Sequence, residues 1–313
     1  MAELHGVTQF ELALRPYFEL VVYIVCTTVS LLAFVPYFKY RKNSNYIGTL
    51  LLFMTACLIC SVIHCVEPAL DVLRSNGFKT TFLLDGTSEE HWFFLAKTTS
   101  FNFIYVTGAF LALDRVFVLT FPAKYTIWRL GTKCTLMATT ICALTLGFLF
   151  GTHAVVNHYS EQESRGRFAT ETAVRYVGIV YDIAAPVELF LHLLFCIQYH
   201  RFARRSKNAG FSKVHRLLTD LILQDSDIQA NQVTMVQSVS QVVFCIAQKL
   251  IHRVNAIFFH MSVPWMFHAA WYYQLSFAFH ILISCSFIVF KLRSMKTVSV
   301  ASSRLNTVYR TSK

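Results

Sequence analysis

The chain has 313 residues, of which 55% are apolar and only 14% are charged, and its mean hydropathy is +0.48. A soluble domain has roughly 25% charged residues, so this composition excludes an ordinary soluble globule, a disordered chain and a disulfide-dense secreted scaffold. It predicts a polytopic membrane protein. A net charge of +11 would suggest a nucleic-acid partner in a soluble protein. Here we expect no nucleic acid and attribute the charge to membrane topology.

Seven stretches reach about 20 apolar residues, the length that an α-helix needs to cross the ~30 Å hydrocarbon layer. The sixth is the weakest, because three glutamines and Lys249 interrupt it. The sequence predicts an all-α membrane protein, with residues 1–313 forming one seven-transmembrane helix bundle that ends in a short basic tail over 291–313. The expected spans are Tyr17–Phe38, Ile47–Val66, Phe93–Leu113, Cys134–Val155, Val174–Ile197, Val233–Ile251 and Met266–Phe290.

Lys and Arg are concentrated in every second connection. They crowd the segments that follow the first, third and fifth spans and the C-terminal tail, whereas the segments between them are poor in basic residues. Basic residues flanking spans stay on the cytoplasmic side. We therefore expect the N-terminus outside, the C-terminus inside and an odd number of spans.

An acid–base pair, Asp114 and Arg115, lies at the expected inner end of the third span, followed by Pro122 and Tyr125. A charge at the bilayer centre costs about 2.5–3.5 kcal/mol on insertion scales, so charges at the edge of the apolar layer need a role. One alternative is structural: both side chains reach the headgroups and fix the topology. The other is a switch, in which a desolvated ion pair biases a bistable bundle.

The offsets of proline and tyrosine from the aspartate resemble the Asp-Arg-Tyr…Pro…Tyr signature of rhodopsin-like G-protein-coupled receptors, with Val116 in the third position. The stretch from Ala112 to Pro122, the Ala230–Val233 start of span six and the short basic tail are similar to the nematode serpentine chemoreceptors, class BC in particular. This resemblance implies that Asp114 restrains Arg115 at rest. When the sixth helix swings outward, Arg115 would be released to meet the G protein, with Pro122 and Tyr125 in the same contact.

The resemblance further implies a receptor for small environmental molecules of the odorant or pheromone class. It would couple to a heterotrimeric G protein in the plasma membrane of sensory neurons or their cilia, with no enzymatic activity. The chain lacks the Asn-Pro-x-x-Tyr pattern in span seven, the Trp-x-Pro pattern in span six and the usual extracellular disulfide. These absences argue against amine, peptide and opsin receptors.

Ionisable and aromatic residues near the outer ends of the spans are candidates for a ligand pocket. Lys97 and Asp182 are placed to meet across the bundle, either as a structural bridge or as the polar floor of the pocket. Glu188 shares a helical face with His192, and we expect the two to satisfy each other. The aromatic candidates, which can equally be interfacial belt residues, are His268, Trp271 and Tyr272.

The sixth span carries a polar stripe at helical spacing, formed by Thr234, Gln237, Gln241 and Gln248. We expect this stripe to face the bundle interior and to hydrogen-bond neighbouring helices.

Two other classes of membrane protein compete with the receptor. Twelve histidines invite a haem-carrying redox enzyme, but no regular pairing on two helices is visible. A ligand-gated ion channel or transporter-like protein is the main alternative, although the paired broken helices and repeats typical of transporters are missing. All nine cysteines lie in apolar stretches and are expected to be small core residues. The sequence predicts no cofactor and no metal.

Overall fold

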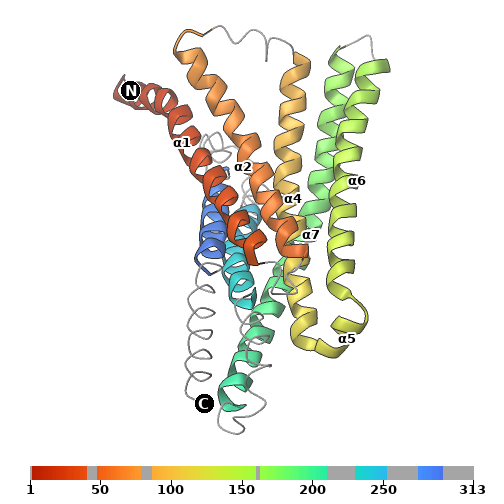
Figure 1. Ribbon diagram of the computed structural model, residues 1–313. Coiled ribbons are helices and arrows are strands. Elements are labelled where there is room, and N and C mark those ends of the chain that lie inside the picture. Colours follow the sequence, from red (N-terminus) through yellow and green to blue (C-terminus); the bar gives the residue numbers. More distant parts are fainter. Residues whose placement is uncertain are drawn as a thin grey trace.

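The computed structural model describes residues 2–40, 48–78, 87–159, 163–209, 230–251 and 274–291. Two further helices, Ala230–Ile251 and Gln274–Lys291, carry no label of their own. Figure 1 shows the helices lined up as one elongated bundle, with α5 at the lower end. The labelled elements are α1 (Ala2–Tyr40), α2 (Gly48–Ser75), α4 (Thr87–Thr120), α5 (Pro122–Ile127), α6 (Leu130–Tyr159), α7 (Glu163–Ala209) and the π-helical turn η2 (Val242–Ile246).

Six of the described helices are long and apolar enough to cross a membrane: Leu14–Phe38, Gly48–Ser75, Leu95–Thr120, Leu130–Thr152, Ala230–Ile251 and Gln274–Lys291. The chain is therefore a helical protein of multi-pass membrane character, as its composition predicts. The expected fifth span, Val174–Ile197, lies inside the continuous helix α7 but is not among the six. The first part of the expected seventh span, 266–273, and the tail over 292–313 lie outside the described residues.

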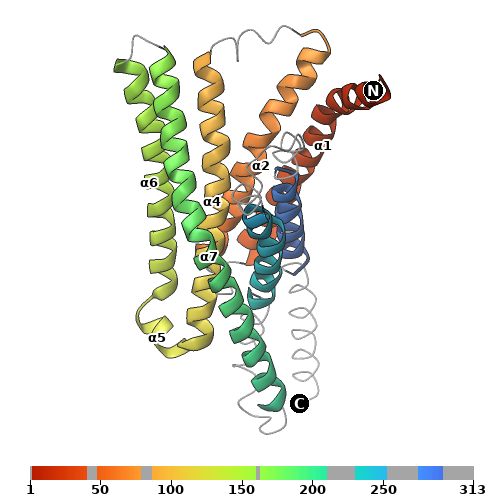
Figure 2. The same ribbon diagram turned by 180° about the vertical axis from the view of Figure 1, so that it is seen from behind.

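Helix α4 is the central element of the bundle. It packs against α2, α6 and α7, and α5 follows directly at its C-terminal end. Within its apolar stretch 56% of the residues are buried, against 22% in the stretches of α1 and α6. Figure 2, seen from behind, shows α4 between α2 and α7, with α6 beyond. A residue on α4 therefore has neighbours on nearly every side.

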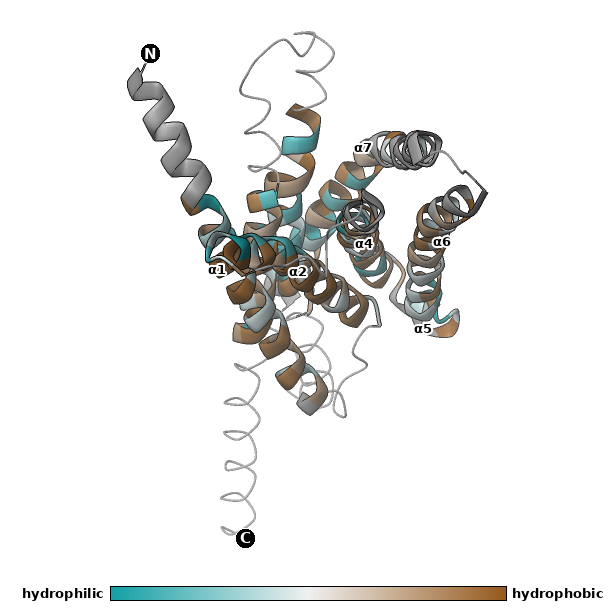
Figure 3. Ribbon diagram, turned by 90° about the horizontal axis from the view of Figure 1, so that it is seen from above, coloured by the Kyte–Doolittle hydropathy of each residue, from teal (hydrophilic) through white to brown (hydrophobic). Residues whose placement is uncertain are grey.

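The outer helices present apolar side chains to their surroundings. Leu136 and Leu144 on α6 and Val35 on α1 are each about two-thirds exposed. In Figure 3, seen along the bundle, α2 and α6 are mostly brown, that is, hydrophobic. Apolar surface on this scale is favourable only against lipid tails, because in water it would drive aggregation.

The π-turn η2 changes which way the polar stripe faces. A π-turn closes its hydrogen bond over five residues instead of four, and Ala247 N–H accordingly reaches Val242 O. The extra residue rotates everything beyond it by about 100° relative to an ordinary α-helix. Gln241 accordingly faces Gly108 of α4, whereas Gln248 hydrogen-bonds to Ser276 of the Gln274–Lys291 helix. The glutamines expected on one face thus contact different helices.

Gly108 is required for the close approach of α4 to the Ala230–Ile251 helix. A Cβ atom there would collide with Oε1 of Gln241, which is itself completely buried. We expect Gly108→Ala to lower the stability of the purified protein by about 1–3 kcal/mol, as for other overpacked cores. Thermal unfolding in detergent measures the effect. The matched control is Gly147→Ala on α6, where nothing lies within 4 Å of the new methyl group. A destabilisation equal in both variants would contradict the packing argument.

Candidate functional site

Asp114, close to the α5 end of α4, is completely buried and accepts three hydrogen bonds. Its Oδ2 accepts from Nη2 of Arg115 at 3.0 Å and from Oγ1 of Thr49 on α2 at 3.2 Å. Its Oδ1 accepts from the hydroxyl of Tyr125 on α5 at 2.8 Å. We call Thr49, Asp114, Arg115 and Tyr125 the Asp114 cluster. One carboxylate thereby joins three helices.

The local sequence explains how Tyr125 reaches back to Asp114. Helix α4 ends at Thr120, and Pro122 begins α5, a position that proline favours because its fixed φ suits a first helical turn. The short helix reverses the chain and places the phenol beside the carboxylate. Gly131, at the start of α6, leaves room for it: a Cβ there would lie 3.1 Å from Oδ1 of Asp114 and would overlap the Tyr125 hydroxyl.

The Tyr125 phenol is a reliable hydrogen-bond donor. Burial is the largest cause that raises the pKa of Tyr125 above its ordinary value, and the negative charge of Asp114 is the second. A raised pKa keeps the proton on the oxygen at neutral pH. The hydroxyl therefore goes on donating to Asp114 under physiological conditions.

Arg115 is buried as deeply as its partner, with 2% of its surface exposed. Only Nη2 is hydrogen-bonded, to Asp114. Nε and Nη1 have no hydrogen-bond partner among the residues that the structure describes. Two unsatisfied donors on a buried guanidinium are costly. Within the described part of the chain, Arg115 is therefore held by one ion pair, with two donors available for another group.

A pocket of about 250 Å³ opens between α7 and the Ala230–Ile251 and Gln274–Lys291 helices. Two of its lining residues, Tyr199 of α7 and Met235, also pack against the small core cluster that contains Val116. Its walls come from α7 and from the two helices nearest the C-terminus, and they are apolar except for three polar side chains. The lining residues are Tyr199, Gln232, Met235, Val236, Phe287, Phe290 and Lys291.

In the middle of the bundle, the first three residues of the polar stripe are buried. Thr234 donates to the carbonyl of Ala230, and Gln237 donates to Gln241 on the next turn. Oε1 of Gln237 and Nε2 of Gln241 have no partner within the described part of the chain. The interior is thus more polar than an apolar helix bundle requires.

Two histidines of the interior are hydrogen-bonded to serines of the Ala230–Ile251 helix. Nδ1 of His192 lies 2.9 Å from Oγ of Ser238, and Nδ1 of His280 lies 2.9 Å from Oγ of Ser240. The expected pairing of Glu188 with His192 is therefore wrong, because His192 bonds to Ser238 on the neighbouring helix and its Nε2 has no partner among the described residues. No group of three or more potential metal ligands occurs among the described residues.

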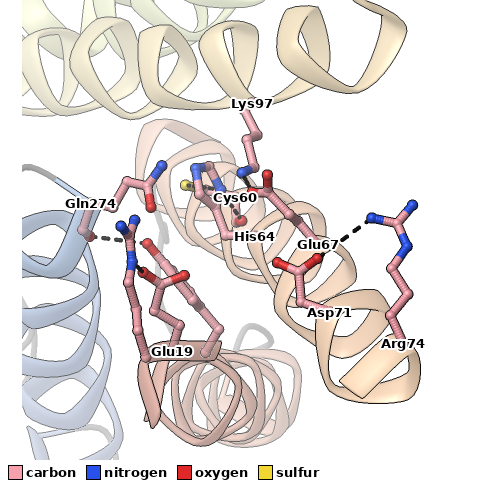
Figure 4. Close-up of polar contacts among 10 residues, drawn as sticks. Glu19, Cys60, His64, Glu67, Asp71, Arg74, Lys97 and Gln274 are labelled. Atoms are coloured by element: carbon pink, nitrogen blue, oxygen red, sulfur yellow. Dashed lines mark hydrogen bonds and ion pairs between the residues drawn. The ribbon is translucent and has the colours of Figure 1, made fainter. Parts of the chain in front are cut away.

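Charged side chains gather at the other end of the bundle, where Figure 4 draws them. Lys97 of α4, with only 13% of its side chain exposed, forms an ion pair with Glu67 of α2. Its ammonium also lies 5.2 Å from the centre of the Phe93 ring. The partner proposed from the sequence was Asp182, whose side chain lies outside the described set. Glu19 and Arg15 on α1 form a second pair nearby at 2.7 Å.

Some residues of both sites were missed or cannot be placed. The sequence analysis overlooked Glu67 because the second span was expected to end one residue earlier, whereas α2 continues through Pro68 to Ser75. Thr49 has no sequence signal that connects it to Asp114, 65 positions later. The pocket candidates His268, Trp271 and Tyr272 lie outside the described residues.

Comparison with known proteins adds no relatives: neither a scan against protein-family models nor a search of curated proteins finds a match. The function must be argued from the geometry alone.

The burial of the Lys97–Glu67 pair predicts that removing Glu67 destabilises the protein more than removing Lys97 does. Glu67→Gln removes the partner of a largely buried ammonium and should cost roughly 1–3 kcal/mol. Lys97→Met leaves a carboxylate that is 47% exposed to be solvated, and should cost less. The double variant should resemble Lys97→Met alone when thermal unfolding is measured. The control is Asp71→Asn, which breaks a solvent-exposed pair with Arg74 and should change stability by less than about 1 kcal/mol. Equal costs for the two single variants would contradict the pairing.

The contact between Gly131 and Tyr125 makes another prediction. Gly131→Ala displaces the phenol from Asp114, so it should destabilise the protein by about 1–3 kcal/mol, as Tyr125→Phe does. Because both changes remove the same hydrogen bond, their effects should not add in the double variant. Gly151→Ala on the same helix meets nothing within 4 Å and serves as the control. If the two changes lower the unfolding temperature additively, Gly131 does not act through the hydrogen bond between Tyr125 and Asp114.

Proposed function

We propose that the chain is a G-protein-coupled chemoreceptor of the nematode serpentine type. A small environmental molecule would bind in the half of the bundle that holds Lys97 and Glu67, and a heterotrimeric G protein would bind at the α5 end. The observation that carries the proposal is the Asp114 cluster. A buried arginine restrained by one ion pair, with two donors left over, is suited to be exchanged between an internal and an external partner.

The pocket lined by Tyr199 and Met235 supports the docking side of this proposal. Its apolar walls suit the apolar face of an inserted helix, and Lys291 at its rim suits an anionic group on that helix. When the pocket widens, the unbonded Nε and Nη1 of Arg115 would find acceptors on the partner. Two binding modes for one guanidinium provide the two states that a switch requires.

The ligand side is supported by the charged and aromatic residues at the opposite end. Lys97 lies among Glu67, Phe93 and the Arg15–Glu19 pair, so a polar molecule entering there competes with existing ion pairs. A ring series runs inward from this region: Tyr23, His64, Phe101 and Phe277 contact one another in turn, with centroid separations of 4.3 to 5.2 Å. These ring contacts would thus transmit a rearrangement at Lys97 to the middle of the bundle. The receptor would face the outside of a sensory neuron or its cilium with its N-terminus.

Two substitutions at the ion pair should change ligand-independent nucleotide exchange in opposite directions. Asp114→Asn weakens the restraint and should raise ligand-independent nucleotide exchange about tenfold, the value of one charged hydrogen bond. Adding Arg115→Ala to that variant should abolish the increase, because the arginine is the group that meets the G protein. Exchange is measured on membranes mixed with a panel of purified G proteins, so no ligand is needed.

Surface labelling of tagged chains must show equal expression and opposite sides for the two termini. Arg74→Ala, at the far end of the bundle, should leave basal exchange unchanged. If the double variant keeps the elevated exchange, or if current flows through the protein in membranes without any G protein, the receptor assignment is wrong.

A further inference from the structure

Helix α5 and the turn that follows it carry an exposed surface that the Asp114 cluster does not use. Ile127 is 75% exposed, Trp128 54% and Phe121 48%. Between these apolar side chains stand exposed basic residues. We call this set the α5 surface: Phe121, Lys124, Ile127, Trp128, Arg129 and Lys133.

The ammonium of Lys124 is held between two aromatic rings. Its Nζ lies 5.8 Å from the centre of the Phe121 ring and 5.5 Å from that of Trp128. Cation–π attraction at these distances orients an otherwise flexible side chain. The positive charge is thereby oriented beside an apolar patch.

Nothing in the adjacent sequence neutralises these charges. From Arg115 to Ser160 the chain contains no Asp or Glu at all. Arg129 has φ +49°, a left-handed conformation that costs a non-glycine residue about 1 kcal/mol or more. A strained backbone that keeps a long basic side chain is typical of positions where that side chain has a task.

The position of the α5 surface matches the depth of lipid headgroups. The apolar stretch of α6 begins at Leu130, directly after Arg129. Farther along α6, Leu136 and Met137 are more than half exposed and so face lipid tails. In Figure 3, α5 lies at the edge of the bundle beside the end of α6, not over its centre. Tryptophan at such a boundary sits with its ring among headgroups and upper acyl chains.

From these observations we infer that the α5 surface binds the headgroup of an anionic phospholipid in the leaflet at that end of the bundle. Lys124, Arg129 and Lys133 contact the headgroup's phosphate and carboxylate oxygens, while Ile127 and Trp128 insert among the acyl chains. The apolar residues favour a lipid over a dissolved anion, which would leave them in water. The inference requires only that the chain spans a bilayer, and so does not depend on the receptor function.

Tryptophan quenching by brominated lipids tests this inference. The full chain is reconstituted in phosphatidylcholine nanodiscs that contain increasing mole fractions of either dibrominated phosphatidylserine or dibrominated phosphatidylcholine. The signal of Trp128 is obtained by subtracting that of Trp128→Phe, which keeps the other three tryptophans. We expect phosphatidylserine to quench Trp128 at a mole fraction at least about fivefold lower, since a single basic residue near an anionic surface contributes a factor of that size.

The triple variant Lys124→Gln, Arg129→Gln, Lys133→Gln should lose this preference. The matched control, Arg201→Gln with Arg204→Gln, neutralises two exposed arginines on α7 and should keep it. Equal quenching by both lipids, or a preference that survives in the triple variant, would overturn the inference. So would displacement by soluble glycerophosphoserine, which would indicate a site for free anions. Loss of G-protein binding with an unchanged lipid preference would identify a protein-docking surface instead.

Discussion

A carboxylate with no solvent contact has to be neutralised by hydrogen-bond donors, and Asp114 imposes this requirement on one end of the molecule. Its donors come from α2, from α4 itself and from α5, so the relative positions of three helices depend on one side chain. Leaving such a group unpaired would cost several kcal/mol. The absence of a side chain at Gly131 follows from the same requirement, because the phenol of Tyr125 occupies that space.

The six residues of α5 connect the interior of the bundle to its surroundings. Tyr125 faces inward and bonds Asp114, while Lys124, Ile127 and the following Trp128 face outward. A rigid helix of this length cannot move one face without the other. A molecule bound to the outer face would therefore change the geometry of the hydrogen bond on the inner face.

The sequence predicted the parts of this structure that local rules determine, and missed those that depend on helix rotation and depth. Apolar length identified six of the membrane-length helices. Tyr125 was singled out only for a G-protein contact, which stays a prediction, and its hydrogen bond to Asp114 was not foreseen. The partner of Lys97 could not be predicted, since Glu67 and Lys97 meet only when α2 extends beyond its apolar stretch. Gln248 bonds a neighbouring helix as expected, but that this helix differs from the one Gln241 faces could not be predicted, because no sequence rule indicates a π-turn.

All nine cysteines are free thiols, and seven of them are buried. No disulfide stabilises the fold, so the protein should fold equally well when it is synthesised under reducing conditions. Water-soluble maleimides reach thiols in a bilayer-embedded helix bundle slowly. A single cysteine introduced at an exposed site such as Ile127 would thus stand out as a reactive handle for spectroscopic probes, without prior removal of the native ones.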